Sequence, residues 1–304
     1  MKRKNRWFWL GLLPFVAMVA LFQLVPIVSM VTGSVSSGSG LTFEYYIRVF
    51  QSEYYLKAIK NSLLISIFSS VIGVVAGLVF AYSITRFSPK MRDRLIMLSN
   101  MTSNFAGVPL AFAYIILLGS NGVFTLLFRQ WGWDVFAGFD LYSWSGLVLV
   151  YVYFQVPLAL LLLYPSFYGI REQWKEAASL LGAGTWQFWR TIGIPVLLPA
   201  VFGTLGILFA NSMGAYATAY ALVGSNFNLL AVRIGNLVSG DVVSEPQLGN
   251  VLAVILALST LLAVYLNHKM IQRAQRFQPG SADRKASVRR KNFKLKTSRL
   301  KEEL

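Results

Sequence analysis

The chain has 304 residues, of which 56% are hydrophobic and 13% are charged, and its mean hydropathy is +0.56. This composition is too apolar for an ordinary soluble domain and is typical of a polytopic membrane protein. The chain has no cysteine and one histidine, so disulfides, thiolate metal sites and histidine metal clusters are excluded. The net charge of +16 makes the distribution of basic residues across the membrane the first question.

Six long apolar segments are predicted to span the membrane as helices, which makes the fold class all-α. They cover approximately residues 7–32, 58–85, 95–118, 141–164, 196–222 and 249–267. The first segment is too long for the apolar part of a signal peptide and has no clear cleavage site, so we expect it to remain as a span. Pro14 and Pro26 are expected to kink it. In the second span, Gly73 and Gly77 form a GxxxG that we interpret as packing within the chain.

The basic residues test this topology. With six spans both termini lie on one side, and that side carries 23 of the 28 Lys and Arg residues. The opposite side carries 5, whereas the 12 acidic residues divide evenly. An excess of Lys and Arg marks the cytoplasmic side. We therefore expect both termini, and the loops at 86–94 and 165–195, to face the cytoplasm.

The loop between the fourth and fifth spans does not have the composition of an irregular connection. The segment from Glu176 to Leu181 consists mostly of good helix formers, and Gly182 and Gly184 then interrupt it. Thr185 is a suitable cap for a second short helix that carries bulky apolar side chains. These residues predict a helix–turn–helix at the membrane surface.

The spacing within this loop resembles the EAA loop of ABC importer permeases, which are members of the type I, MetI-like family. That pattern is EAA, three residues, Gly, nine residues and I-x-L-P, and its positions here are Glu176, Ala177, Ala178, Gly182, Ile192, Ile194 and Pro195. Ile194 stands where the pattern has leucine. The alternative for the loop by itself is an amphipathic interfacial helix without a partner.

The resemblance implies an organisation and a set of partners. Residues 1–57 would form an added N-terminal helix and outer segment, 58–270 the MetI-like core, and 271–304 a basic cytoplasmic tail. The implied partners are a cytoplasmic ABC ATPase dimer, a second permease subunit (a paralogue or a second copy), an extracytoplasmic solute-binding protein and membrane lipid. The implied location is the bacterial inner membrane, as a multi-pass protein. Within the family, the chain is most similar to permeases for polyamines, 2-aminoethylphosphonate, sulfate, thiamine or ferric iron, and we expect a small polar solute of the polyamine type. Iron permeases of this group are usually about twice as long and have two EAA loops, so iron is the less favoured of these substrates.

Other sequence features limit the alternatives. No charged residue lies in the interior of a predicted span, the one charge within the stated bounds being Lys60 near the start of the second, which argues against an ion-coupled carrier. The chain contains no P-loop sequence and no catalytic triad or carboxylate pair in its spans, so we expect a non-catalytic permease whose ATP is hydrolysed on another subunit. No cofactor, metal or nucleic acid is expected. An ATP-independent channel or carrier is the main alternative, and a membrane scaffold is a third.

Polar residues and helix breakers within two spans are our candidates for the translocation pathway. They are Asn104, Gly107 and Pro109 in the third span, and Asn211, Ser212 and Tyr216 in the fifth. Polar packing between helices is the alternative for each of them. In the loop, Trp186 and Trp189 are expected either to anchor the short helices to the spans or to lie in the interfacial aromatic belt. The tail from Gln278 is expected to be disordered, with either no contact or a contact to anionic lipid.

Overall fold

The computed structural model describes residues 4–37, 40–132, 139–239 and 245–276. The sequence expectation for the tail from Gln278 onward lies outside these residues. Six helical stretches in the described part are long and apolar enough to cross a membrane: Gly11–Val35, Glu53–Ile84, Val108–Gln130, Trp144–Phe167, Thr185–Met213 and Pro246–Ala274. The all-α fold with six spans is confirmed. In the described ranges the strands are β1 (Ser36–Ser37) and β2 (Gly40–Leu41), which pair antiparallel with Ser36 opposite Leu41.

The described chain divides into two compact units, and α4, α8, α11 and α14 each contribute residues to both. Unit 1 comprises residues 1–69, 105–151 and 211–262. Its helices are α1 (Lys4–Val19), α2 (Val25–Val35), α3 (Glu44–Gln51), the start of α4 (Glu53–Ile84), α6 (Val108–Leu118), α7 (Val123–Gln130), the start of α8 (Trp144–Phe167), the last residues of α11 (Ile194–Met213), α12 (Tyr216–Val223), α13 (Leu230–Ser239) and most of α14 (Pro246–Arg276).

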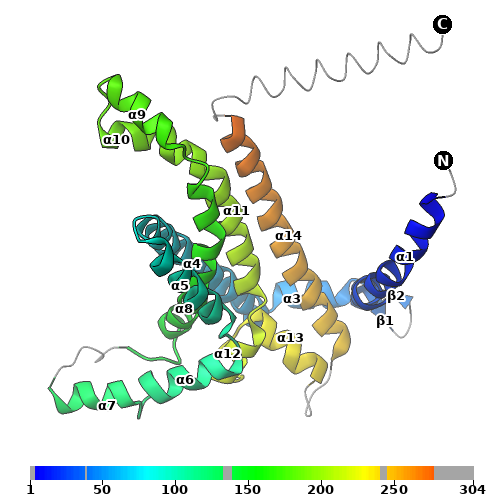
Figure 1. Ribbon diagram of the computed structural model, residues 1–304. Helices are drawn as coiled ribbons and strands as arrows, with labels where there is room; N and C mark the ends of the chain where they lie inside the picture. Colours follow the sequence, from blue (N-terminus) through cyan, green and yellow to red (C-terminus); the bar gives the residue numbers. More distant parts are fainter. Residues whose placement is uncertain (1–3, 38–39, 133–138, 240–244, 277–304) are drawn as a thin grey trace, which may run out of the picture. The chain divides into compact units, whose positions relative to one another are not determined.

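Unit 2 comprises residues 70–104, 152–210 and 263–304. It contains the remainder of α4 and α8, α5 (Pro89–Asn104), α9 (Glu172–Leu180), α10 (Thr185–Phe188), most of α11 and the end of α14. Figure 1 shows α9 and α10 as a hairpin beyond the ends of α8 and α11. The chain thus forms the helix–turn–helix that the loop sequence predicts.

The core of unit 2 packs α4 against α8. Val74, Ala81, Leu160 and Leu163 are buried there, with other small and aliphatic side chains. A Cβ placed on Gly77 would overlap the Cβ of Ala159, so only glycine permits this approach of the two backbones. The predicted packing role of the GxxxG is confirmed.

Polar contacts tie together segments of unit 1 that are distant in sequence. Arg48 on α3 forms an ion pair with Glu245, just before α14, at 2.8 Å. Asn61 on α4 donates to the carbonyl of Asn228 at 3.1 Å. The backbone N–H of Leu230, at the start of α13, donates to the Ser62 hydroxyl at 2.8 Å and thereby has a partner at a helix end where no intrahelical acceptor is available.

The third span differs from its prediction as one helix over 95–118. α5 ends at Asn104, the segment 105–107 is not helical, and α6 begins at Val108. Gly107 has φ +78°, a conformation that L side chains rarely adopt, and Pro109 lies in the first turn of α6. The membrane-crossing stretch of this region is therefore Val108–Gln130, and α5 is a separate helix before it.

The fifth span also differs at both of its ends from the predicted range 196–222. α10 continues without interruption through a π-helical segment, Trp189–Gly193, into α11, so this stretch begins at Thr185 and ends at Met213. The wider π turn precedes Pro195, whose ring and missing N–H disturb ordinary α-helical bonding. A second π segment, Ala20–Leu24, similarly precedes Pro26.

Candidate functional site

The first helix of the loop, α9, presents the EAA residues. Glu172 lies in its first turn, where a carboxylate is favourable beside the unpaired N–H groups. Glu176 and Ala177 are exposed and Ala178 is half-buried. The ion pair present among the described residues is Arg48–Glu245, so within that part of the chain the Glu176 carboxylate is not in an ion pair. It is available to a partner.

The turn after α9 is a Schellman motif centred on Gly182. The N–H of Ala183 donates to the carbonyl of Ala178 at 2.9 Å, and the N–H of Gly182 donates to that of Ser179 at 3.0 Å. Gly182 has φ +78°, as this motif requires at its C′ position. Gly182 therefore ends the helix and reverses the chain. Its backbone conformation alone requires glycine here, because no atom lies within 4 Å of where its Cβ would be.

The second helix begins one residue earlier than the sequence indicates. Gly184, not Thr185, occupies the N-cap position, and its carbonyl accepts from the N–H of Phe188 at 3.0 Å. No side chain caps this helix. The expectation that Thr185 caps it is wrong, because the extended backbone of Gly184 already starts the turn.

Phe188 and Trp189 attach the hairpin to the end of α4. Phe188 is buried, and the Trp189 ring meets that of Tyr82 edge-on with centroids 5.4 Å apart. Gly193 lies directly beneath the indole, where any Cβ would overlap it. The anchoring role expected of Trp189 is confirmed. That of Trp186 is wrong, because Trp186 is 73% exposed in the hairpin, and its alternative role in the interfacial belt stays a prediction.

The tip of the hairpin exposes an apolar surface that the sequence analysis did not single out. Leu180 and Leu181 are each 88% exposed, and Trp186 lies in the same hairpin. We call these three residues the hairpin tip. Large exposed apolar side chains grouped in this way mark interaction sites. The sequence signal was present, since two leucines directly precede the glycine that ends α9.

The remaining positions of the pattern follow the hairpin into α11. Ile192 lies half-buried in the π segment, Ile194 is exposed, and Pro195 is half-buried at the start of α11. The pattern thus extends from an exposed helix to the beginning of a spanning helix. It covers both the exposed first helix of the loop and the attachment of the loop to the span.

Polar contacts of Tyr168 and Arg92 hold the segment between α8 and α9. Tyr168, just after α8, hydrogen-bonds to the Tyr164 hydroxyl and accepts from Arg92 Nη1 of α5 at 3.2 Å. The hydrogen bond with Tyr164, assisted by Arg92, lowers the pKa of the Tyr168 phenol below its ordinary value. Arg92 also donates to the carbonyls of Thr85 and Phe87. The entrance to α9 is therefore held by the ends of α4 and α5.

The pathway candidates are only partly brought together. In unit 1, the N–H of Gly107 donates to the hydroxyl of Thr218 on α12 at 2.8 Å, so the break before α6 adjoins α12. Pro109 lies exposed in the first turn of that helix, and Tyr216 stacks on Tyr220 with centroids 5.4 Å apart. Thr218 is buried and was not identified from the sequence, because nothing in its position within an apolar run marks it.

The other three candidates make different contacts. Ser212 is buried and hydrogen-bonds to Ser69 at 3.1 Å, so it packs α11 against α4. Asn211 is exposed. Asn104 belongs to unit 2 and donates to the carbonyl of Asn100 within its own helix at 2.8 Å. Across the described residues, no group of three or more His, Asp or Glu side chains could hold a metal ion.

Comparison with known families gives a match over most of these elements. Residues 73–276 match the family described as "Binding-protein-dependent transport system inner membrane component". The match begins within α4 and includes the whole hairpin. It covers more than half of the chain.

Three curated relatives illustrate the range of similar proteins. The ferric transport system permease protein FbpB of Actinobacillus pleuropneumoniae is 25% identical over 80% of this chain and 36% of its own length. The sulfate transport system permease protein CysW of Escherichia coli K12 is 28% identical over 56% of this chain and 57% of its own. The spermidine/putrescine transport system permease protein PotC of Haemophilus influenzae is 24% identical over 83% of this chain and 93% of its own. The aligned regions thus span less than two thirds of FbpB and CysW.

A solved structure shares the fold. A chain in the crystal structure of a bacterial ABC transporter that imports the acidic polysaccharide alginate superposes with a TM-score of 0.70. The two chains are 19% identical, and the match covers 89% of this chain and 96% of that one. The chain therefore shares the fold of that chain.

Proposed function

The chain belongs to the family of binding-protein-dependent transport system inner membrane components, and from this premise we propose that it is the permease subunit of an ATP-driven importer. The observation that carries the proposal is the α9–α10 hairpin. It combines the EAA spacing, an unpaired Glu176, a glycine turn and an exposed apolar tip, and it is attached to α4 through Trp189. Such an element fits a groove on a separate ATPase, and the chain itself has no ATP-binding P-loop.

The proposed assembly has four kinds of component. Two cytoplasmic ATPases bind the hairpins of two permeases, one of which is this chain and the other a paralogue or a second copy. A solute-binding protein delivers the substrate on the outer side. ATP draws the ATPases together, and the hairpins transmit this movement to α11 and the other spans, which then open the pathway outward.

The proposed orientation places the hairpin and both termini in the cytoplasm. It is supported by the 23 Lys and Arg residues on that side against 5 on the other. We also propose the division of the chain into an added N-terminal segment, 1–57, a permease core, 58–270, and a basic cytoplasmic tail, 271–304. The family match over 73–276 lies largely within the proposed core.

We favour a small polar solute of the polyamine type as substrate. The alignment with PotC covers 83% of this chain and 93% of PotC, whereas the alignments cover 36% of FbpB and 57% of CysW, so the match to the spermidine/putrescine permease extends over a larger share of the relative. The stacked rings of Tyr216 and Tyr220 are partly exposed, and aromatic faces attract ammonium groups. Uptake of labelled putrescine, compared with uptake of sulfate and of 2-aminoethylphosphonate, tests this choice.

The class of transport is tested by purification and reconstitution. A tagged chain, expressed with the genes that flank its own, should co-purify with an ATPase. In proteoliposomes, uptake should require both ATP and the binding protein. Uptake that proceeds without ATP, together with the absence of any ATPase from the purified material, would contradict the proposal and favour a channel or carrier.

A further inference from the structure

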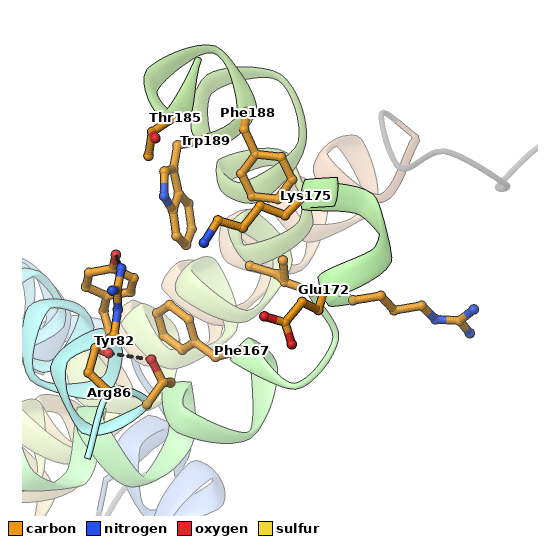
Figure 2. A pocket seen from close by; sticks show the side chains of 11 residues that line it. Tyr82, Arg86, Phe167, Glu172, Lys175, Thr185, Phe188 and Trp189 are labelled. Atoms are coloured by element: carbon orange, nitrogen blue, oxygen red, sulfur yellow. Dashed lines mark hydrogen bonds between the residues drawn. The ribbon is translucent and has the colours of Figure 1, made fainter. Parts of the chain in front are cut away.

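A pocket of about 350 Å³ lies between the hairpin and the ends of α4 and α8, entirely within unit 2. Tyr82 near the end of α4 and Arg86 just after that helix line it on one side, and Lys175 and Trp189 line it from the hairpin. Figure 2 shows the Lys175 ammonium group directed toward the side of the pocket formed by Tyr82 and Arg86. Cationic groups from two separate elements therefore face one space.

The charge in this pocket is not balanced. Arg86, Arg171 and Lys175 line it together with one acid, Glu172. None of the four is in an ion pair among the residues that the structure describes. Arg86 lies over the Tyr82 ring and donates to its hydroxyl, a neutral partner that leaves the positive charge uncompensated. A pocket with this excess of positive charge attracts an anion.

A second pocket shares part of the same wall. It has a volume of about 340 Å³ and is lined by Arg92 as well as by Arg171 and Glu172. The Nε of Arg92 is buried and has no hydrogen-bond partner, although the rest of this guanidinium is bonded. A buried N–H donor without an acceptor is uncommon and indicates a site where an acceptor can enter. Both pockets therefore offer donors to oxygen atoms.

We propose that these adjoining pockets bind a phosphate-bearing anion. Arginine and lysine together suit phosphate, because guanidinium groups bind its oxygens in pairs and an ammonium group binds them as a point charge. The aromatic walls formed by Tyr82, Phe167 and Trp189 suit the region where headgroups meet the apolar layer. The phosphate can belong to an anionic phospholipid or to a soluble phosphate compound, and the test below separates these sources.

Occupancy of the site would brace the hairpin. A phosphate held by Arg86, just after α4, and by Lys175 of α9 connects the end of a span to the helix that carries Glu176. This consequence rests on the proposed function, since it concerns the transmission of movement from an ATPase. Anion binding itself does not rest on the proposed function. A failure of the binding test therefore leaves the proposed transport class unaffected, and a failure of the transport test leaves the anion site unaffected.

The first measurement is lipid retention. The purified full-length chain is placed in nanodiscs of phosphatidylcholine with phosphatidylglycerol, extracted and examined by native mass spectrometry. The wild type should retain phosphatidylglycerol, and the double variant Arg86→Gln, Lys175→Gln should bind it about thirtyfold more weakly, at about fivefold for each basic residue lost. Glu172→Gln should bind it more tightly. Arg190→Gln, which removes an exposed positive charge of the same loop outside the pocket, is the matched control and should bind as the wild type does.

The second measurement uses inorganic phosphate with the chain in nanodiscs of phosphatidylcholine alone, with chloride as the control salt. A saturable thermal stabilisation that requires Arg86 and Lys175 identifies a soluble phosphate compound as the source, whereas retention of phosphatidylglycerol without this effect identifies the lipid. Equal losses of binding in the double variant and in Arg190→Gln would overturn the proposal, because binding would then reflect general surface charge. The absence of binding in both measurements would also overturn it.

Discussion

At the scale of single residues, Glu176 is exposed and occupies a position of the EAA pattern. Among the residues that the structure describes it forms no ion pair, so its removal should cost little folding energy, within about 0.5 kcal/mol. We expect Glu176→Lys to insert normally and to reduce ATPase retention roughly tenfold or more, because a charge of the wrong sign enters the contact. Co-purification and uptake measure this effect. Glu44→Lys, on the exposed side of α3, is the control, and normal uptake by the Glu176 variant would exclude the residue from coupling.

At Gly182, the effect of a substitution is predicted to depend on how readily the new residue adopts a positive φ, and not on the size of its side chain. Its surroundings are open, but its φ of +78° costs an L side chain about 1–2 kcal/mol, and more for a β-branched one. Gly182→Val should therefore reduce uptake and ATPase stimulation several-fold by distorting the turn. Gly182→Asn should retain most of both, since asparagine adopts this conformation more readily. Equal activity of the two variants would show that the turn does not depend on this conformation.

At the scale of elements, the attachment of the hairpin depends on the contact between Trp189 and Gly193. A valine at 193 would displace the indole from Tyr82, at a cost of about 1–3 kcal/mol for overpacking. We expect Gly193→Val to retain ATPase binding through the hairpin tip while uptake per ATP hydrolysed falls. Gly203→Ala on α11, where a Cβ has ordinary contacts, should behave as the wild type. A Gly193→Val transporter with unchanged coupling would show that this attachment is not needed.

The elements also show how far the sequence alone determines the structure. The six spans and the hairpin were predictable because long apolar runs, EAA spacing and paired glycines are local signals. The end of α5 at Asn104 was not, although Gly107 and Pro109 were noticed, because polar residues within a span can either break a helix or pack within it. The difference between exposed Trp186 and packed Trp189 depends on the position of Tyr82, about a hundred residues earlier in the chain. Contacts of this kind depend on the tertiary fold.

At the scale of the whole molecule, the basic tail is predicted to be dispensable for transport. The tail from Gln278 onward has nine basic residues, three acidic residues and few apolar ones, so it cannot form a core of its own. Truncation after Pro279 should leave insertion, complex formation and uptake intact, because the inner loops already supply an excess of basic residues. Quantified uptake by the truncated, correctly inserted protein measures this. A loss of uptake would instead indicate a regulatory contact of the tail with the ATPase.

The central claim is that the hairpin joins this chain to a separate ATPase, and the absence of cysteine from the sequence permits a direct measurement. A single cysteine is introduced at Leu181, which is 88% exposed at the hairpin tip, and is labelled with a photoactivatable crosslinker. The matched control carries the cysteine at Leu41, which is 85% exposed on β2. In the assembled transporter, illumination should join the Leu181→Cys chain to the ATPase and stop uptake, and the Leu41→Cys chain should do neither. Crosslinking to the ATPase from both positions or from neither, in a complex that transports, would contradict the account.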